Sequence, residues 1–191
     1  MHEWYLATSN SNKVFEFEAI LRGPIVQVDL ELVEVQSLDV EDVIEAKARD
    51  AYVKVGCPVL VEDTALHILS WGGLPGALVT WFMKTVGPMG ICTMLGESSE
   101  RKAHAKTAIG YFDGTQFHKY SGTINGSIAE KPRGLNGFAW DSIFIPDGYS
   151  QTFAEMEPDR KNDISMRRLA LEALRESSSA RNHSDRQHET G

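Results

Sequence analysis

One helix-to-strand segment constrains the fold more than any other feature of this sequence. Apolar side chains recur over residues 40–55 at the spacing of one helix face, which predicts an amphipathic helix. Gly56 follows where a C-terminal cap belongs. The next residues, 59–61, are apolar and predict a buried strand that ends at Glu62 and Asp63. A helix that leads into a buried strand indicates a fold built from both helices and a sheet.

The rest of the chain alternates strands and helices at first and contains hairpins later. A glycine-rich loop over residues 72–76 separates the two parts, and Asp113-Gly114 is a hairpin turn signal. This arrangement predicts a mixed α/β fold rather than a sheet of parallel strands only. The further predicted elements are strands over 4–7, 25–30, 102–112, 116–121, 123–128 and 143–145 and helices over 13–21, 77–86, 88–95 and 164–176.

Length and the distribution of apolar residues predict one domain with a short tail. A chain of 191 residues is long enough to bury a sizeable core in a single domain. Residues 177–191 contain no large apolar side chain, and such a segment cannot bury enough surface to fold. We therefore expect a folded domain over residues 1–176 and a disordered tail over residues 177–191.

Charge and hydropathy argue against two classes of partner. The formal net charge is −8, whereas proteins that coat nucleic acid or anionic membranes need a basic surface. The sequence has no run of 18 apolar residues, and no basic region followed by an apolar stretch at its start. Cys57 and Cys92 form no metal-ligand pattern and are expected to be free thiols. We expect a cytoplasmic protein that binds neither nucleic acid nor membrane.

A polar turn between the first strand and the first helix is a candidate phosphate site. Thr8, Ser9 and Asn10 precede the predicted helix, and Lys13 lies in its first turn. Backbone N–H groups at a helix start attract anions, and hydroxyl, amide and ammonium groups add donors. The turn lacks the glycines of a P-loop. An ordinary N-cap followed by a solvated lysine would also account for these residues.

Two carboxylates at the predicted strand end, Glu62 and Asp63, are candidate ligands for Mg²⁺. Ligands usually bind at the carboxyl ends of strands in α/β sheets. Carboxylate oxygens suit Mg²⁺, which a few carboxylates hold together with substrate phosphates. Glu34, after the second predicted strand, is a further candidate ligand. The same residues are compatible with plainer roles, because Asp63 could cap a helix and Glu34 could be an ordinary surface residue.

Two segments in the second half of the chain are candidates for base recognition. Residues 134–141 combine glycines with Phe138 and Trp140, which suits a loop that stacks on a flat ring and presents Asp141 to its edge. Residues 161–168 gather cations and hydroxyl groups near the start of the last helix. A turn with core aromatics and a capped, solvated helix start would also account for them.

The order and spacing of several short motifs are more specific than any one motif. The motifs are Thr8-Ser9-Asn10-x-x-Lys13, Glu34-Val35-Gln36, Val61-Glu62-Asp63-Thr64, Gly73-Leu74-Pro75-Gly76, Pro132-Arg133-Gly134, Phe138-x-Trp140-Asp141, Thr152-Phe153-Ala154-Glu155-Met156 and Lys161-Asn162-x-x-Ser165-x-Arg167. Together they resemble the inosine triphosphate pyrophosphatase family, from about Leu6 to Leu174, and its eukaryotic branch in particular.

The resemblance implies a fold, a reaction and a role for each matching residue. Members have an elongated α/β fold with a mixed sheet and two lobes around a deep cleft, and they are homodimers. They cleave ITP, dITP and XTP between the α and β phosphates with Mg²⁺, and Asp63 would also orient or deprotonate the attacking water. The implied residues are Thr8, Ser9, Asn10, Lys13 and Lys47 for the phosphates, Glu34 and Asp63 for Mg²⁺, Phe138, Trp140 and Asp141 for the base, and Lys161, Ser165, Met166 and Arg167 for base and phosphates together.

Some positions depart from the family pattern, and most of them lie on the base side. The metal and phosphate residues are kept, so the sequence predicts pyrophosphatase chemistry but leaves the preferred base open. The departures are Met166 for a base-recognising histidine, Ala139 for glycine, Ser142 for proline, Ser9 for glycine, Leu78 for tyrosine and Thr80 for lysine.

Two other functions are compatible with the sequence. A pyrophosphatase for another modified base or for pyrimidine nucleotides would use the same chemistry, although the segments at Phe138 and Lys161 fit purines better. A nucleotide-binding protein without catalysis is the second, but it would have no need to keep Glu34 and Asp63.

Overall fold

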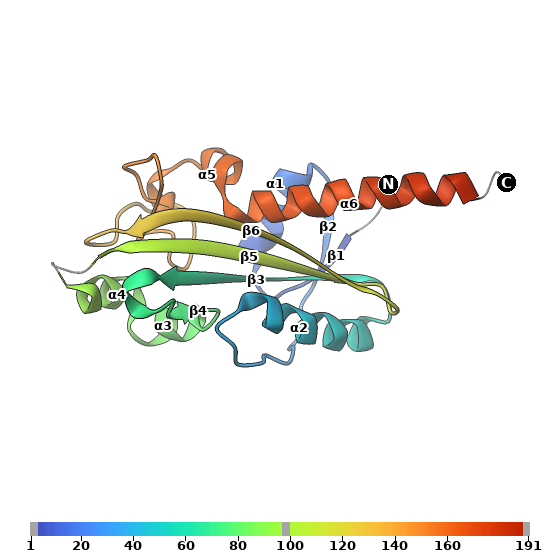
Figure 1. The fold of residues 1–191 in the computed structure, drawn as a ribbon, viewed down its shortest axis with the longest axis horizontal. Helices are drawn as coiled ribbons and strands as arrows, with labels where there is room; N and C mark the ends of the chain where they lie inside the picture. The colour runs from blue at the N-terminus through green and yellow to red at the C-terminus, as the bar shows by residue number, and fades with distance from the viewer. Residues whose placement is uncertain (1–3, 97–99, 189–191) are drawn as a thin grey trace.

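A mixed sheet runs through the molecule (Figure 1). The computed structural model describes residues 4–96 and 100–188, with side chains as far as Ser178. Within this part of the chain the strands are β1 (Trp4–Ala7), β2 (Ile25–Val28), β3 (Val59–Ile68), β4 (Pro75–Gly76), β5 (Lys102–Phe112), β6 (Phe117–Ile128) and β7 (Phe144–Pro146). Their order is β2-β1-β3-β5-β6-β7, and β4 pairs with β3 outside this path. β1 is parallel to β2 and β3, whereas all other pairs are antiparallel, which confirms the predicted mixed α/β fold.

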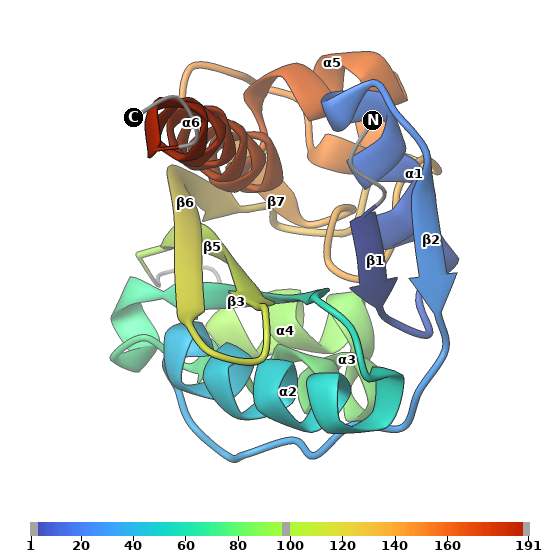
Figure 2. The ribbon, with the colours of Figure 1, turned by 90° about the vertical axis from the view of Figure 1, so that its right-hand side faces the viewer.

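Helices cover both faces of the sheet (Figure 2). The helices on one face are α1 (Ser11–Leu21), α5 (Pro158–Ile164) and α6 (Met166–His188), and those on the other face are α2 (Val40–Val55), α3 (Val79–Thr85) and α4 (Gly87–Leu95). Two short 3-10 helices, Leu69–Trp71 and Phe153–Glu155, lie in the connections. Separate apolar clusters lie under α1 and α6, under α2, and around α3 and α4.

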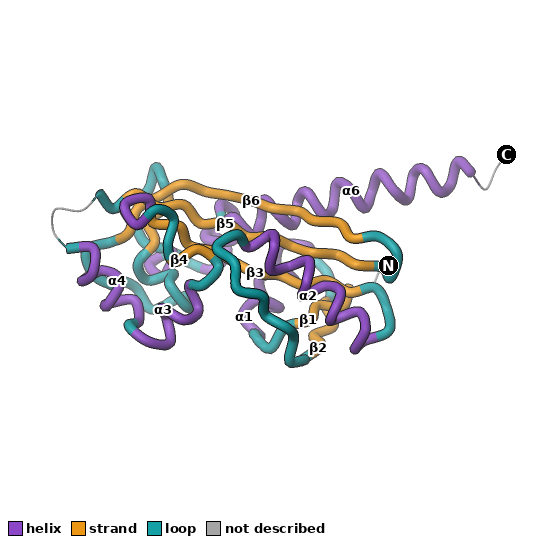
Figure 3. Tube along the Cα trace, turned by 60° about the horizontal axis from the view of Figure 1, so that its bottom comes forward, coloured by secondary structure: helices purple, strands orange, loops and turns teal. Residues whose placement is uncertain are grey.

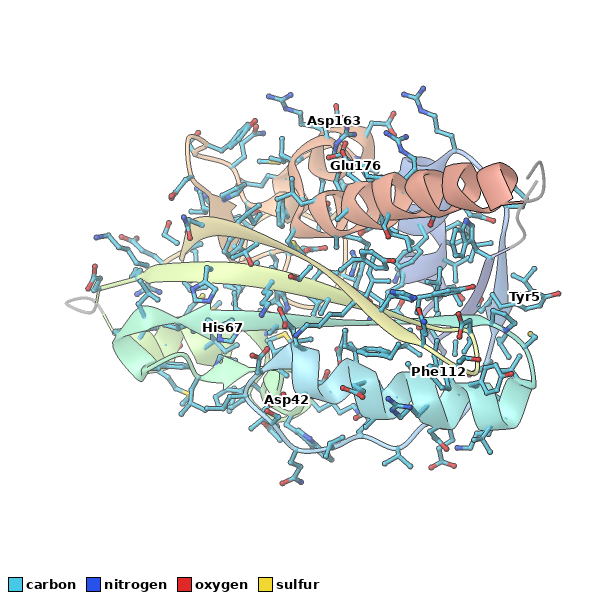
Figure 4. The ribbon with its side chains drawn as sticks, turned by 45° about the vertical axis from the view of Figure 1, so that its right-hand side comes forward. Tyr5, Asp42, His67, Phe112, Asp163 and Glu176 are labelled. Carbon is cyan, nitrogen blue, oxygen red and sulfur yellow. The ribbon has the colours of Figure 1, made fainter. Side chains whose placement is uncertain are left out.

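Helix α2 has the bounds that its apolar spacing predicts. Its first turn is capped by Asp39, whose side chain accepts the backbone N–H of Glu41 at 3.0 Å. Gly56 ends it with a φ of 76°, a left-handed conformation that glycine adopts at little cost. Phe112 lies between the sheet and α2 (Figure 4) and meets Tyr52 edge-to-face at 5.2 Å. The buried face of α2 therefore fixes this helix against the centre of the sheet.

Strand β3 is longer than its sequence predicts. It continues through Glu62 and Asp63 because β5 pairs with it at every residue from Val59 to Ile68. The two carboxylates therefore leave the middle of a strand rather than its end, and Asp63 does not cap a helix. Neighbouring residues of a strand point to opposite faces, so the two carboxylates face different layers of helices.

Other predicted elements also differ from the structure. The second strand stops at Val28, and the two strands predicted over residues 116–128 are one strand, β6. Gly122 allows α6 to cross β6 closely, because a Cβ there would lie 2.2 Å from the carbonyl oxygen of Met166. The last helix begins at Met166 rather than residue 164, and the short helix α5 before it was not predicted.

The C-terminal helix extends past the ends of the strands (Figures 1 and 3). It is continuous to His188, and residues 189–191 lie outside the described part of the chain. The boundary at 176 and the disorder of residues 177–191 therefore stay predictions. Cys57 and Cys92 are free thiols, as expected. In the described residues, every helix is too short or too polar to cross a membrane.

Candidate active site

A cavity of about 500 Å³ opens where the sheet has a gap. On one edge of β3, β1 pairs at Leu60, and β4 pairs at Leu66 and His67. Between these pairs no described strand pairs with that edge, and Glu62, Asp63 and Thr64 line the cavity there. Helices from both faces of the sheet contribute further lining residues. The volume is within the range of sites that bind small molecules.

The structure brings the predicted site residues together in this cavity, with the exception of Ser165. That residue is fully buried, and its hydroxyl accepts the backbone N–H of Arg168 at 3.2 Å, so it caps the start of α6. The predicted residues that line the cavity are Thr8, Ser9, Asn10, Lys13, Glu34, Lys47, Asp63, Phe138, Trp140, Asp141, Lys161, Met166 and Arg167.

The turn between β1 and α1 presents donors to the cavity. The Asn10 side chain caps α1 by accepting the backbone N–H of Asn12 at 3.0 Å. The Thr8 hydroxyl accepts the backbone N–H of Asn10 at 3.1 Å and orders the turn. Lys13, one turn into the helix, points its ammonium toward β3, where Glu62 accepts it. These bonds occupy the N–H groups of Asn10 and Asn12, so the turn offers an anion the hydrogens of the Thr8 hydroxyl and the Asn10 amide, beside the Lys13 ammonium.

Glu62 is the buried centre of the charges on the α1 and α6 face. Its carboxylate lies 2.6 Å from the ammonium of Lys13 and 2.9 Å from the guanidinium of Arg167. Burial disfavours the charged carboxylate, but Arg167 and Lys13 outweigh burial and lower the pKa of Glu62 to about 2. Glu62 is therefore ionised at neutral pH and holds two cations at the cavity wall.

A glutamate that the sequence did not indicate joins Arg167 to Lys161. Glu16, on α1, forms an ion pair with the Arg167 guanidinium and another with the Lys161 ammonium, the latter at 2.8 Å. Lys161 also contacts Asp141 at 2.6 Å. Burial raises the pKa of Asp141 despite Lys161, whereas Arg167 and Lys161 outweigh burial at Glu16 and lower its pKa. In the sequence Glu16 has no feature that separates it from a surface glutamate.

On the α2 face, Lys47 holds two carboxylates. Its ammonium lies 2.8 Å from Asp63 and 3.0 Å from Glu34. Burial opposes the charge of Lys47, but Asp63 and Glu34 outweigh burial and raise its pKa. Among the described residues, no three His, Cys, Asp or Glu side chains could hold a metal by themselves. Glu34 and Asp63, which converge on Lys47, could together hold Mg²⁺, because Mg²⁺ is usually held by one or two carboxylates and substrate phosphates.

Asp141 organises the turn that precedes Trp140. Its buried carboxylate accepts the backbone N–H of Phe138 at 2.8 Å. A Cβ at Gly137 would lie 2.2 Å from the same carboxylate, so only glycine fits there. Ala139 has a φ of 52°, in the left-handed region, which costs an alanine about 1 kcal/mol relative to glycine. The turn presents Phe138 to the cavity and buries Trp140 in the core.

The wall nearest the core is apolar, and part of it was not predicted. Met166 lines the cavity and also packs in the apolar cluster that contains Trp140 and Val79. The other lining residues were not among the predicted site residues, and those on α3 follow one another at helical spacing. They are Ala7, Leu30, Leu32, Glu62 as a wall charge, Thr64, Val79, Thr80, Met83, Lys84 and Ala139.

Comparisons with known proteins agree with the fold and identify a family. The model of the Ham1 family matches residues 4–177. The chain is 42% identical over 178 residues to inosine triphosphate pyrophosphatase 2 of Trypanosoma cruzi, covering 91% of each protein. It is 38% identical to the dITP/XTP pyrophosphatase of Hyperthermus butylicus, covering 88% of this chain and 90% of that protein. A HAM1 protein from Coxiella burnetii has a TM-score of 0.80 at 30% identity, covering 94% of this chain and 100% of that one.

Proposed function

The chain belongs to the Ham1 family, and we propose that it hydrolyses the triphosphates of inosine, deoxyinosine and xanthosine to the monophosphate and pyrophosphate. The observation that carries the proposal is the cavity, which combines a helix-start anion site, two carboxylates on one cation and an aromatic ring. The relatives named for activity on ITP and on dITP and XTP support the same reaction. The kinship with a trypanosomal enzyme supports a place near the eukaryotic branch.

In this proposal the turn before α1 binds the phosphates. Thr8, Ser9 and Asn10 offer hydroxyl, amide and backbone donors, and the Lys13 ammonium lies beside them. The phosphates of a triphosphate carry charge that such donors neutralise without covalent chemistry. Lys13 and Lys47 would balance the charge that grows on the leaving pyrophosphate.

Glu34 and Asp63 are the residues that would hold Mg²⁺, which supplies further charge neutralisation at the phosphates when bound. Asp63 has one carboxylate oxygen on Lys47 and the other on the backbone N–H of Thr64, so its orientation is fixed from two sides. A carboxylate fixed in this way can orient a water molecule toward the α-phosphorus. We assign that role to Asp63.

On the base side, Phe138 is the residue we propose to stack on the purine ring. Its ring lies under the Lys161 ammonium, 4.7 Å from the ring centroid, so it is held at the cavity wall. Trp140 and Asp141 are buried behind it and support the turn, and Arg167 and Lys161 are donors for polar atoms of the substrate.

The products of hydrolysis test the proposed function. With Mg²⁺, the wild-type protein is expected to convert ITP and XTP to the monophosphate and pyrophosphate, because the turn at α1 holds the β and γ phosphates and leaves the α-phosphorus open to water. Chromatography of ITP, XTP, GTP, ATP and pyrimidine triphosphates measures both the base preference and the bond cleaved. Diphosphate with orthophosphate would contradict the proposal. Turnover of pyrimidines alone, or binding without turnover, would favour the other two functions.

Met166 is expected to set the discrimination between bases. A thioether is only a weak acceptor, whereas an imidazole in the same place offers a ring nitrogen to the base edge. We expect Met166→His to raise the ratio of kcat/KM for ITP over GTP and ATP by roughly five- to tenfold, the size of one polar contact. Met94→His, on the exposed side of α4, is the control and should leave the ratios unchanged. Ratios within about twofold of wild type would mean that Met166 only packs in the core.

We further propose that the protein is a cytoplasmic homodimer, the state that the family resemblance implies. Its net charge of −8 supports the expectation that it binds neither nucleic acid nor anionic membranes.

A further inference from the structure

The cations that line the cavity differ in one respect, which is whether a carboxylate neutralises them. Lys13 pairs with Glu62, Lys47 with Glu34 and Asp63, Lys161 with Asp141, and Arg167 with Glu16 and Glu62. Lys84 also lines the cavity, but no carboxylate of the described residues lies within ion-pair distance of it. Its charge is the one that is not already balanced from within the described part of the protein.

Lys84 reaches the cavity from a different wall. Lys13, Lys161 and Arg167 stand on helices of one face of the sheet. Helix α3 lies on the other face, as does α2 with Lys47 (Figure 2). The Lys84 ammonium lies 5.5 Å from the centroid of the Trp81 ring, a cation–π contact that restricts where the side chain points. Thr80, one helical turn earlier, lines the same wall.

The charge balance of the cavity gives Lys84 its importance. The lining carboxylates are Glu34, Glu62, Asp63 and Asp141, and Glu16 contacts two of the lining cations. These five negative charges exceed the four of the paired cations, and an excess of negative charge disfavours a polyphosphate. Lys84 removes that excess. Its ammonium can also bind a phosphate without first breaking an ion pair with a described carboxylate.

We propose that Lys84 binds the triphosphate of the substrate from the α3 wall, opposite the turn at α1. The proposal rests on the proposed function, because it assigns the phosphate group of that substrate to one further residue. The contact lies at the rim of the cavity, where Lys84 is exposed to solvent. A rim charge contributes mainly to capture of the ligand and to the salt dependence of binding, and less to the chemical step.

The test compares Lys84→Gln with Lys102→Gln, which removes the same charge from an exposed site on β5 outside the cavity. For Lys84→Gln we expect KM to rise roughly five- to tenfold for ITP and XTP alike, with kcat within about twofold of wild type and a weaker dependence of kcat/KM on salt. Calorimetric titration with inorganic tripolyphosphate in metal-free buffer should show a similar loss of affinity. Lys102→Gln should match wild type in each measurement.

A second variant moves the charge instead of removing it. Thr80→Lys combined with Lys84→Gln returns an ammonium to the same wall one turn away, and it should recover at least about half of the lost tripolyphosphate affinity. An unchanged tripolyphosphate affinity in Lys84→Gln, or a loss confined to XTP, would overturn the proposal and place Lys84 near the base. If wild type hydrolyses no triphosphate, the proposed function fails, while the tripolyphosphate titration still decides the role of Lys84.

Discussion

Asp63→Asn is expected to lower kcat by roughly 10²-fold or more, the effect of losing a main electrostatic contribution to catalysis. The change is nearly isosteric, and Lys47 keeps Glu34 as an ion-pair partner, so the fold should persist. The loss arises because an amide neither carries the charge that a metal requires nor accepts a proton from water. Pyrophosphate release under saturating substrate measures kcat, and thermal unfolding followed by circular dichroism checks the fold.

The control for this variant is Asp163→Asn. Asp163 stands on the outer side of α5 (Figure 4) and forms a solvent-exposed ion pair with Arg168 at 3.4 Å. Such pairs contribute little, so its turnover should equal that of wild type. Retention of more than about half of the wild-type kcat in Asp63→Asn would show that this carboxylate is not part of the catalytic machinery.

Glu62→Gln is expected to destabilise the protein by about 3–5 kcal/mol, because it removes the charge shared by two cations and leaves buried Arg167 partly uncompensated. Urea unfolding at neutral pH measures the free energy of unfolding. Glu172→Gln breaks a half-exposed pair with Arg168 at 2.9 Å and should cost less than about 1 kcal/mol. If Glu62→Gln also lowered the free energy of unfolding by less than about 1 kcal/mol, the buried ion pairs of Glu62 would not stabilise the fold.

The pH dependence of this effect has a definite sign. The folded state lowers the pKa of Glu62 from 4.5 to about 2, so folding favours its charged form. The stability that Glu62 contributes is therefore complete above pH 4.5 and is lost as the pH falls through about 2. The difference in unfolding free energy between wild type and Glu62→Gln should be constant above about pH 5 and should shrink in more acidic solution.

Local sequence predicted the elements whose ends are set by local chemistry. Helix α2 begins after the capping residue Asp39 and ends at Gly56, so its bounds follow from its own residues. The end of β3 could not be predicted in this way. Its continuation from Glu62 to Ile68 depends on pairing with β5, about forty residues further along the chain. Helix α5 was missed because it is short and carries few apolar residues.

The site was predicted by motif rather than by geometry, and its gaps follow from that. Motifs identified the residues that meet at the cavity, including Asp63 and Arg167, but placed Ser165 there, which the structure uses as a helix cap. Glu16 and Lys84 lie outside the motifs, on α1 and α3. Their importance comes from what stands beside them in space, namely Arg167 and Lys161 for Glu16, and the absence of a described carboxylate partner for Lys84.

The ion pairs of Glu16 have a consequence for how the protein is made. The pair with Lys161 spans 145 positions of the sequence and the pair with Arg167 spans 151. The two pairs therefore link α1 to α5 and α6, the last two helices of the described chain. A ribosome produces α1 early and α6 at the end, and domains generally complete their folding as units. A chain synthesised only as far as β7 contains the turn before α1 but lacks the cations of residues 161 and 167. If the proposed site is right, we expect nucleotide binding only after α6 has docked, so that binding would report a chain that has finished folding.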